Sequence, residues 1–142
     1  MGRLLKFWSL TRCEKKFFCE ASVLLFASNA SVKVIPFRHI DRFLRTRWND
    51  GIQADIDHEQ EIRLVKHSIS RAANVLPWKN PCLSRSIAQF IMLRRRGISA
   101  VLILGVRFSD HSSLDAHAWV DTEPAGNDKS SERFVIVTRI GA

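Results

Sequence analysis

A helical segment followed directly by an apolar β-type run, in residues 82–106, limits the folds open to this chain more than any other feature. After Cys82 the apolar residues recur at helical spacing, and Gly97 stands where a glycine commonly ends a helix. The next nine residues, "ISAVLILGV", are aliphatic and rich in β-branched types. Two alternating segments, "HAWVDT" and "RFVIVTRI", follow. The strands are therefore expected to gather at the carboxyl-terminal end.

The first half of the chain carries helical patterns. Apolar residues repeat at intervals of three or four in residues 10–34, in the basic segment "PFRHIDRFLRTRW" and in "EIRLVKHSISRAANVL". Helices first and a small antiparallel sheet last is the order of an α+β fold. The length of 142 residues suits a single domain over 1–142, with a helical portion in 1–76 and a helix with its sheet in 77–142.

The chain is basic, with 22 Lys and Arg against 14 Asp and Glu and a net charge of +8. This charge favours anionic partners, but it does not indicate whether the partner is an acidic peptide, a nucleic acid or an anionic membrane. The longest apolar stretch, "ASVLLFASNA", has half of the ~20 residues that a membrane span needs, so we expect no stable membrane insertion. Arg94, Arg95 and Arg96 are interpreted as a solvated helix end.

Cysteine usage indicates a reducing compartment. Cys13, Cys19 and Cys82 are odd in number and irregularly spaced, which is no disulfide framework, and a cytoplasmic location is expected. The histidines and cysteines show no paired spacing typical of metal ligands, and there is no glycine-rich phosphate loop. We therefore expect neither a metal nor a cofactor.

Cys82 is a candidate nucleophile because of its position. At a helix start, free backbone N–H groups and the positive end of the helix dipole favour the thiolate, which is the reactive form of the side chain. His117 is the best placed base, since a central strand beside that helix would carry its ring to the sulfur. From the residues alone, an inert cysteine at this position remains an alternative.

Several phrases together resemble a known family. "PCLSRSIAQFIMLRRRGISAVLILGVR", followed by "LDAHAWVD" and "ERFVIV", is similar in order and spacing to the transglutaminase-like cysteine peptidases of lasso-peptide biosynthesis, the bacterial B proteins that remove a leader peptide. The resemblance covers roughly residues 77–139. It implies a transglutaminase-like or papain-like core, with Cys82 as the nucleophile at the start of a helix packed on the sheet and His117 as the base.

The acid that would orient His117 is less certain. Asp121 shares the strand face of His117 but lies about 13 Å away at ~3.3 Å per residue. Asp128 would return opposite His117 on the neighbouring strand, and the resemblance also implies an acid about there. A turn centred at residues 124–125 would bring Glu132 opposite the ring instead. We expect Asp128, with Glu132 as the rival.

The surroundings of the thiol can also be anticipated. An oxyanion hole needs N–H donors near the sulfur, and the backbone N–H of Cys82 is one candidate. Trp78 is either a second donor, through its indole N–H, or a cover for the core. Trp119, two residues after His117, is expected to share the histidine's face of its strand and to shield the site.

The resemblance further implies partners. The chain looks like the separate peptidase half of a split system, because no leader-recognition domain is expected in a chain that is helical from its start. A small leader-binding protein would deliver the precursor peptide, and the freed core peptide would pass to an asparagine-synthetase-like cyclase that closes a macrolactam ring. The product would be a ribosomally made peptide antibiotic.

Two other functions remain open. Cys82, His117 and Asp128 could also transfer an acyl group to an amine instead of to water. The net charge and the basic segment in residues 36–48 also suit a nucleic-acid or membrane-surface binding module. Against that module, the sequence contains no recognised nucleic-acid motif, and its basic residues are spread from Arg3 to Arg139.

Overall fold

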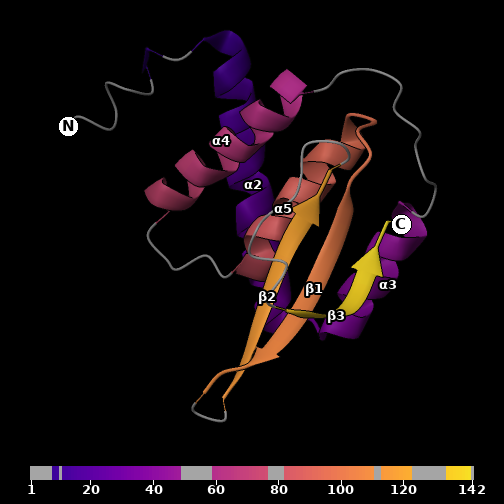
Figure 1. Ribbon diagram of the computed structural model, residues 1–142. Coiled ribbons are helices and arrows are strands. Elements are labelled where there is room, and N and C mark those ends of the chain that lie inside the picture. The colour runs from indigo at the N-terminus through magenta and orange to yellow at the C-terminus, as the bar shows by residue number, and fades with distance from the viewer. Residues whose placement is uncertain are drawn as a thin grey trace.

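The computed structural model describes residues 8–9, 11–48, 59–76, 82–110, 113–122 and 134–141. Within these ranges the helices precede the strands along the chain (Figure 1). The elements are α2 Arg12–Val34, α3 Phe37–Arg47, α4 Glu59–Val75, α5 Cys82–Arg95, β1 Val101–Phe108, β2 Leu114–Asp121 and β3 Val135–Ile140. The predicted α+β fold, helical in its first half and ending in a small antiparallel sheet, is confirmed.

A hydrogen-bonded box fixes where α2 begins. The Thr11 hydroxyl accepts from the Glu14 backbone N–H at 3.3 Å, and the Glu14 carboxylate accepts from the Thr11 backbone N–H at 2.9 Å. The second bond lowers the pKa of Glu14 below its ordinary value, because it stabilises the ionised carboxylate. The box supplies partners for N–H groups that the first turn of a helix leaves free.

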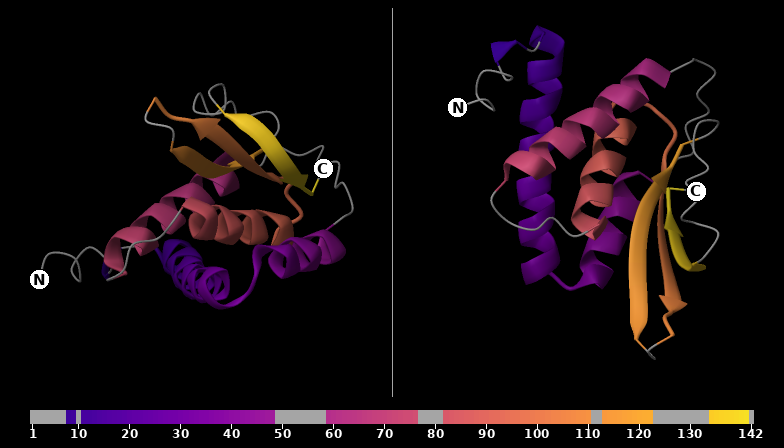
Figure 2. Two further views of the ribbon diagram at one scale, coloured as in Figure 1. Left: turned by 90° about the horizontal axis from the view of Figure 1, so that it is seen from below. Right: turned by 60° about the vertical axis from the view of Figure 1, so that its left-hand side comes forward.

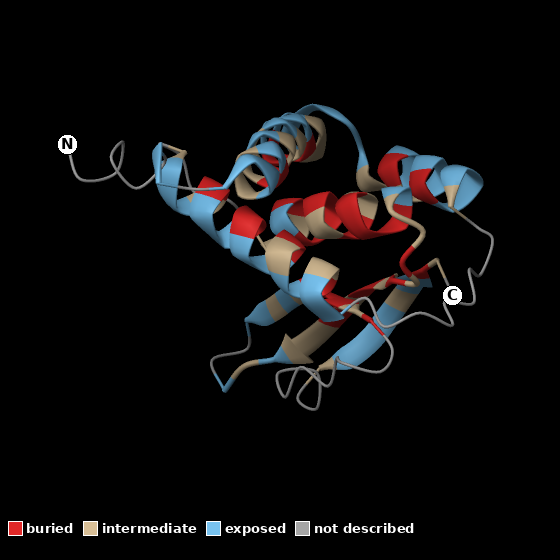
Figure 3. Cartoon of the chain, turned by 90° about the horizontal axis from the view of Figure 1, so that it is seen from above, coloured by how far each residue is buried: buried red, intermediate tan, exposed pale blue. Residues whose placement is uncertain are grey.

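The core lies between the sheet and the helices. The helices cover one face of the sheet, with α5 next to it and α2 on the far side (Figure 2). Most of α5 is buried (Figure 3), and Phe90, Met92 and Leu93 have no exposed surface. The buried residues of α5 include the polar Ser84, Ser86 and Arg94 beside its apolar ones.

Helix α2 is long and apolar enough to cross a membrane by length and composition, a criterion that core helices also meet. One of its faces is enclosed: Phe17, Ala21 and Leu25 recur every four residues and are at most 8% exposed. That face packs against α4 and α5. The buried half of α2 therefore has an ordinary place in the core.

Helix α5 ends in the turn predicted at Gly97. Gly97 has a φ of 73°, a left-handed conformation that glycine adopts without steric cost. The Ile98 N–H donates to the Leu93 carbonyl and the Gly97 N–H to the Arg94 carbonyl, both at 3.1 Å. This turn reverses the chain, so β1 runs back along α5 (Figure 1).

The three strands lie in the order β2-β1-β3, and both pairs are antiparallel. The central strand β1 is apolar on both faces over its first six residues, whereas β2 alternates with polar residues and β3 begins with three exposed apolar residues. Leu102 of β1 lies fully buried between its partners Val120 and Ile140.

This order corrects two expectations. His117 lies on β2, which is an edge strand and not a central one. The last strand pairs with β1 and not with β2, so the hairpin that underlies the expected positions of Asp128 and Glu132 opposite His117 is wrong. The two carboxylates themselves lie outside the described residues.

Arg94 and Arg96 at the end of α5 are held by the fold, which corrects their interpretation as a solvated end, whereas Arg95 is exposed as expected. Arg94 is 3% exposed and donates to the Trp48 carbonyl at 2.7 Å. The Arg96 guanidinium lies 4.2 Å from the ring centroid of Phe17 and pairs with the Glu20 carboxylate. These contacts join the end of α5 to α2 and to the end of α3.

Candidate active site

Cys82 is the first residue of α5, as predicted, and its free thiol is half-buried. At this position it lies beside the free backbone N–H groups of the first helical turn, where a negative charge is stabilised. Cys13 and Cys19, in contrast, are exposed on α2. Among the three thiols, Cys82 alone begins a helix.

A buried hydrogen bond joins α5 to β2 one helical turn after Cys82. The Ser86 hydroxyl donates to the Ala118 carbonyl at 2.9 Å. Because β1 runs against α5 and β2 runs against β1, α5 and β2 point the same way. One turn of helix is about 6 Å, or roughly two strand residues. Cys82 therefore lies level with the part of β2 that carries His117.

The His117 ring projects from the outer face of the sheet. Val120 belongs to the core between the sheet and the helices, so the alternation of the strand turns His117 and Trp119 to the opposite face. Within the described part of the chain, no hydrogen bond joins the Cys82 thiol to the His117 imidazole. The structure thus places the two residues at one level along α5 and β2, with the His117 ring on the sheet face turned away from the helix.

An aromatic cluster holds the His117 ring on that face. Its centroid lies 5.7 Å from that of Trp119, with the planes 22° apart, and 5.3 Å from that of Phe134. The expectation that Trp119 shares the histidine's face of the strand is confirmed, and Trp119 is only 6% exposed there. Phe134, just before β3, reaches His117 across the central strand.

Gly105 makes this contact across β1 possible. It is paired with His117, and a Cβ at this position would lie 2.8 Å from the Cβ of Phe134 and 2.9 Å from the Trp119 ring. Real Cβ atoms are not found at such distances. The absence of a side chain at Gly105 therefore lets the aromatic cluster close over the sheet.

We expect Gly105→Ala to destabilise the protein by about 1–3 kcal/mol, the usual cost of overpacking a closed site. The added methyl group must displace Trp119 or Phe134, so the near-ultraviolet circular dichroism should change as well. Gly97→Ala is the matched control, because its Cβ meets nothing within 4 Å and only its φ is strained. It should cost about 1–2 kcal/mol and leave the aromatic signal intact. Equal aromatic signals from both variants would contradict the packing role of Gly105.

Three of the expected site residues, Trp78, Asp128 and Glu132, lie outside the described residues. Asp121 is described: it ends β2 opposite Val101, on the same face as His117 but beyond Trp119. The indole therefore stands between that carboxylate and the imidazole. Across the described residues, no group of three or more His, Cys, Asp and Glu side chains can hold a metal ion.

A charged pair beside the cluster was missed by sequence reasoning. Asp115 lies two residues before His117 on the same strand face, and Arg107 is its partner on β1. The Arg107 guanidinium is 3.4 Å from the Asp115 carboxylate and 5.0 Å from the Phe134 ring centroid. The alternation of "LDAHAWVD" identifies Asp115, but Arg107 needs the strand register, which the sequence does not contain.

A family model described as the transglutaminase-like superfamily matches residues 24–139, from within α2 to the end of β3. This span contains Cys82, His117 and Asp128. No curated protein and no solved structure matches the chain.

Proposed function

The chain belongs to the transglutaminase-like superfamily, whose members are typically cysteine-dependent enzymes and include cysteine peptidases. From this premise we propose that the protein is a cysteine peptidase that removes the leader peptide from a ribosomally made lasso-peptide precursor. The observation that carries the proposal is the Cys82 thiol at the first residue of α5, within the matched span and level with His117 on β2.

The proposed reaction is acyl transfer to water in two steps. The Cys82 sulfur attacks the scissile carbonyl while His117 accepts the thiol proton, and the imidazolium then gives that proton to the leaving amine. Water hydrolyses the resulting thioester, which frees the leader's carboxylate and restores the thiol. The backbone N–H of Cys82 supports this role as a donor to the oxyanion.

The step from the present geometry to the reaction is a movement of the His117 ring toward the sulfur. Catalytic hydrogen bonds often form only when substrate binds. Here the His117 ring projects from the sheet face turned away from α5, so the reaction requires the ring to change sides and not only a long hydrogen bond to shorten. Among the strands that the structure describes, β2 pairs with β1 alone.

We assign the orienting acid to Asp128, with Glu132 as the rival. Both lie in the stretch of chain that leads from the end of β2 to Phe134, and Phe134 contacts His117. The stretch returns to the histidine at Phe134, which supports an acid within it. Asp121 is less favoured because Trp119 lies between it and the imidazole on the same strand face.

The proposed setting is the cytoplasm, with a small leader-binding protein that delivers the precursor and an asparagine-synthetase-like cyclase that receives the freed core peptide. The sequence phrases shared with the lasso B proteins support these partners. No cofactor is needed for the two steps, since the thiol, the imidazole and water supply every proton and bond.

The test is cleavage of a full-length precursor, followed by mass spectrometry, with and without the leader-binding protein. The purified chain alone is expected to cleave slowly, and the partner should raise the rate by about 10²-fold or more by holding the leader near the thiol. Hydrolysis should leave a leader with a free carboxylate and a core peptide with a new amino terminus.

A precursor with a scrambled leader is the control, because it retains the scissile bond and loses the delivery. Rapid cleavage by the isolated chain, unchanged by the partner, would contradict the split system. A leader that ends in an amide with an added amine would instead identify an acyl-transfer enzyme. Intact precursor in the presence of all components would rule out the peptidase.

A further inference from the structure

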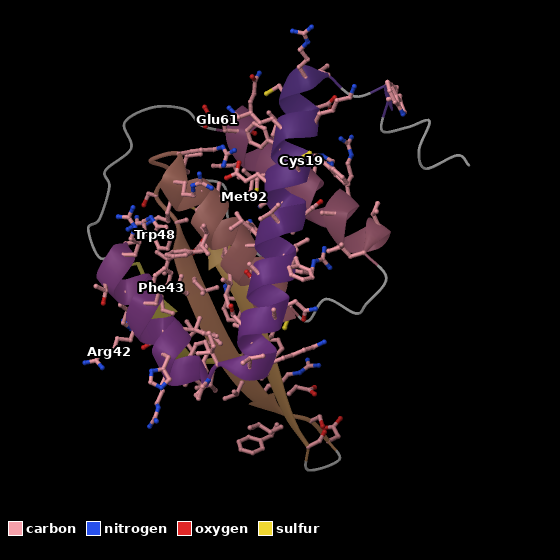
Figure 4. All side chains as sticks on the ribbon, turned by 180° about the vertical axis from the view of Figure 1, so that it is seen from behind. Cys19, Arg42, Phe43, Trp48, Glu61 and Met92 are labelled. Carbon is pink, nitrogen blue, oxygen red and sulfur yellow. The ribbon has the colours of Figure 1, made fainter. Side chains whose placement is uncertain are left out.

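The outward face of α2 is apolar along most of its length. Opposite the enclosed face lie residues that are all exposed: Cys19, Val23, Phe26, Ala27, Ala30 and Val34. Val23 is 68% exposed and Val34 81%. We call these six residues the α2 stripe. They span about 22 Å of helix at 1.5 Å per residue, and α2 lies in front when the molecule is seen from behind (Figure 4).

Exposed apolar surface of this extent commonly marks a place where something binds. A helix that is apolar on its enclosed face needs polar residues on the other if that other face is to lie in water. The α2 stripe lacks them over its central turns. The composition of the α2 stripe is therefore more typical of a face that contacts another apolar surface than of a face exposed to water.

The charges around the α2 stripe are all of one sign. Arg12 and Lys16 are exposed at its start and Lys33 at its end. The two acidic residues of α2 are turned elsewhere, since Glu14 closes the box with Thr11 and Glu20 pairs with Arg96. An apolar stripe with basic ends complements an apolar surface that carries negative charge.

Aromatic and basic residues extend this pattern at both ends of α2. Trp8 is 78% exposed, with the Lys15 ammonium 5.7 Å from its ring centroid. At the other end, Ile35 is 42% exposed, and Arg38 and Arg42 follow as exposed residues of α3. Tryptophan beside lysine and arginine is the composition that settles at a membrane–water interface.

A second copy of the chain is the less favoured occupant. Antiparallel packing of two α2 stripes would set Arg12 and Lys16 of one copy against Lys33 of the other, and parallel packing would set each basic end against its equal. Like charges disfavour both arrangements. An anionic bilayer accepts the same basic ends and covers the apolar residues between them.

We propose that the α2 stripe is a docking surface that holds the protein on an anionic lipid bilayer without crossing it. Val23, Ala30 and Val34 enter the headgroup boundary, and Arg12, Lys16 and Lys33 contact lipid phosphates. The sheet lies on the other side of the molecule from α2 (Figure 2). Docking therefore leaves the outer sheet face, with His117, turned toward the aqueous phase.

The experiment is co-sedimentation with phosphatidylcholine vesicles, prepared with and without phosphatidylglycerol. The wild type should bind the vesicles that contain phosphatidylglycerol, bind the others at least tenfold more weakly, and dissociate as sodium chloride is raised. The double variant Val23→Glu/Ala30→Glu should lose binding by tenfold or more, because it puts two negative charges on the central turns. Both sites are exposed and glutamate favours helices, so the fold should persist.

Val135→Glu/Val137→Glu is the matched control, since Val135 is 71% and Val137 63% exposed on β3, in the sheet. It adds the same two negative charges away from the α2 stripe and should bind as the wild type does. Circular dichroism of all three proteins checks that each is folded. If the control loses binding as fully as the double variant, the net charge alone is responsible and the proposal fails.

Two further outcomes overturn the proposal. Failure of the folded wild type to bind phosphatidylglycerol vesicles at low salt removes it outright. A dimer in light scattering that the double variant abolishes would assign the α2 stripe to a second copy. Neither result bears on peptide cleavage, which is measured with a soluble precursor.

Discussion

Cys82→Ala is expected to abolish leader removal, with a rate lower by about four orders of magnitude or more, because no other group on α5 can form the thioester. His117→Ala should fall by a similar factor, since the thiol then has no base and the leaving amine no acid. Both variants should remain folded. Cys82 is half-buried at a helix start, and alanine is well tolerated within helices.

The matched controls are Cys13→Ser and Cys19→Ser. Both cysteines are exposed on α2, away from β2, and their replacement should leave the cleavage rate within about twofold of the wild type, as is usual for exposed sites. Rates are measured on the precursor with the leader-binding protein present, and thermal unfolding checks each fold. A folded Cys82→Ala protein that still cleaves the precursor would end the proposal.

The second large effect is expected from Asp128→Asn, which should lower turnover by about 10⁴-fold while precursor binding persists. The amide keeps the size of the side chain and removes the charge that stabilises the imidazolium and selects the ring tautomer. Asp121→Asn should change turnover little, because Trp119 lies between that carboxylate and His117.

The Glu132→Gln variant distinguishes between Asp128 and Glu132 as the acid that orients His117. A crippled Glu132→Gln protein with a near-normal Asp128→Asn protein would transfer the role to Glu132 and leave the peptidase intact. Normal turnover in all three variants would mean that Cys82 and His117 act as a dyad. Substrate binding, measured separately with the Cys82→Ala variant, distinguishes a lost chemical step from lost affinity.

The pairing of Arg107 with Asp115 adds a reason to measure these variants at more than one salt concentration. The pair lies two residues from His117 along the strands, and the Arg107 and Asp115 side chains are partly exposed at 41% and 48%. Exposed ion pairs contribute little to stability, roughly 0–1 kcal/mol. The charges of Arg107 and Asp115 nevertheless act on any charged group that approaches the His117 ring from the outer face of the sheet.

The sequence by itself determined the features that depend on neighbouring residues. Helical spacing after Cys82, a glycine suited to the left-handed turn at Gly97 and the alternation around His117 are local, so the start of α5, its end and the shared face of His117 and Trp119 are correctly predicted. The α+β order follows from the same local periods.

The tertiary structure decided what depends on residues far apart in the chain. Periodicity does not say which strands pair. In the structure β1 is the central strand and β3 pairs with it, which removes the expected pairing of β3 with β2. The burial of Arg94 needs the Trp48 carbonyl from α3, and the contact of His117 with Phe134 needs the space above Gly105. Each of these contacts joins segments that are far apart in the sequence. Such contacts form only when the whole core is packed, so local sequence patterns do not predict them.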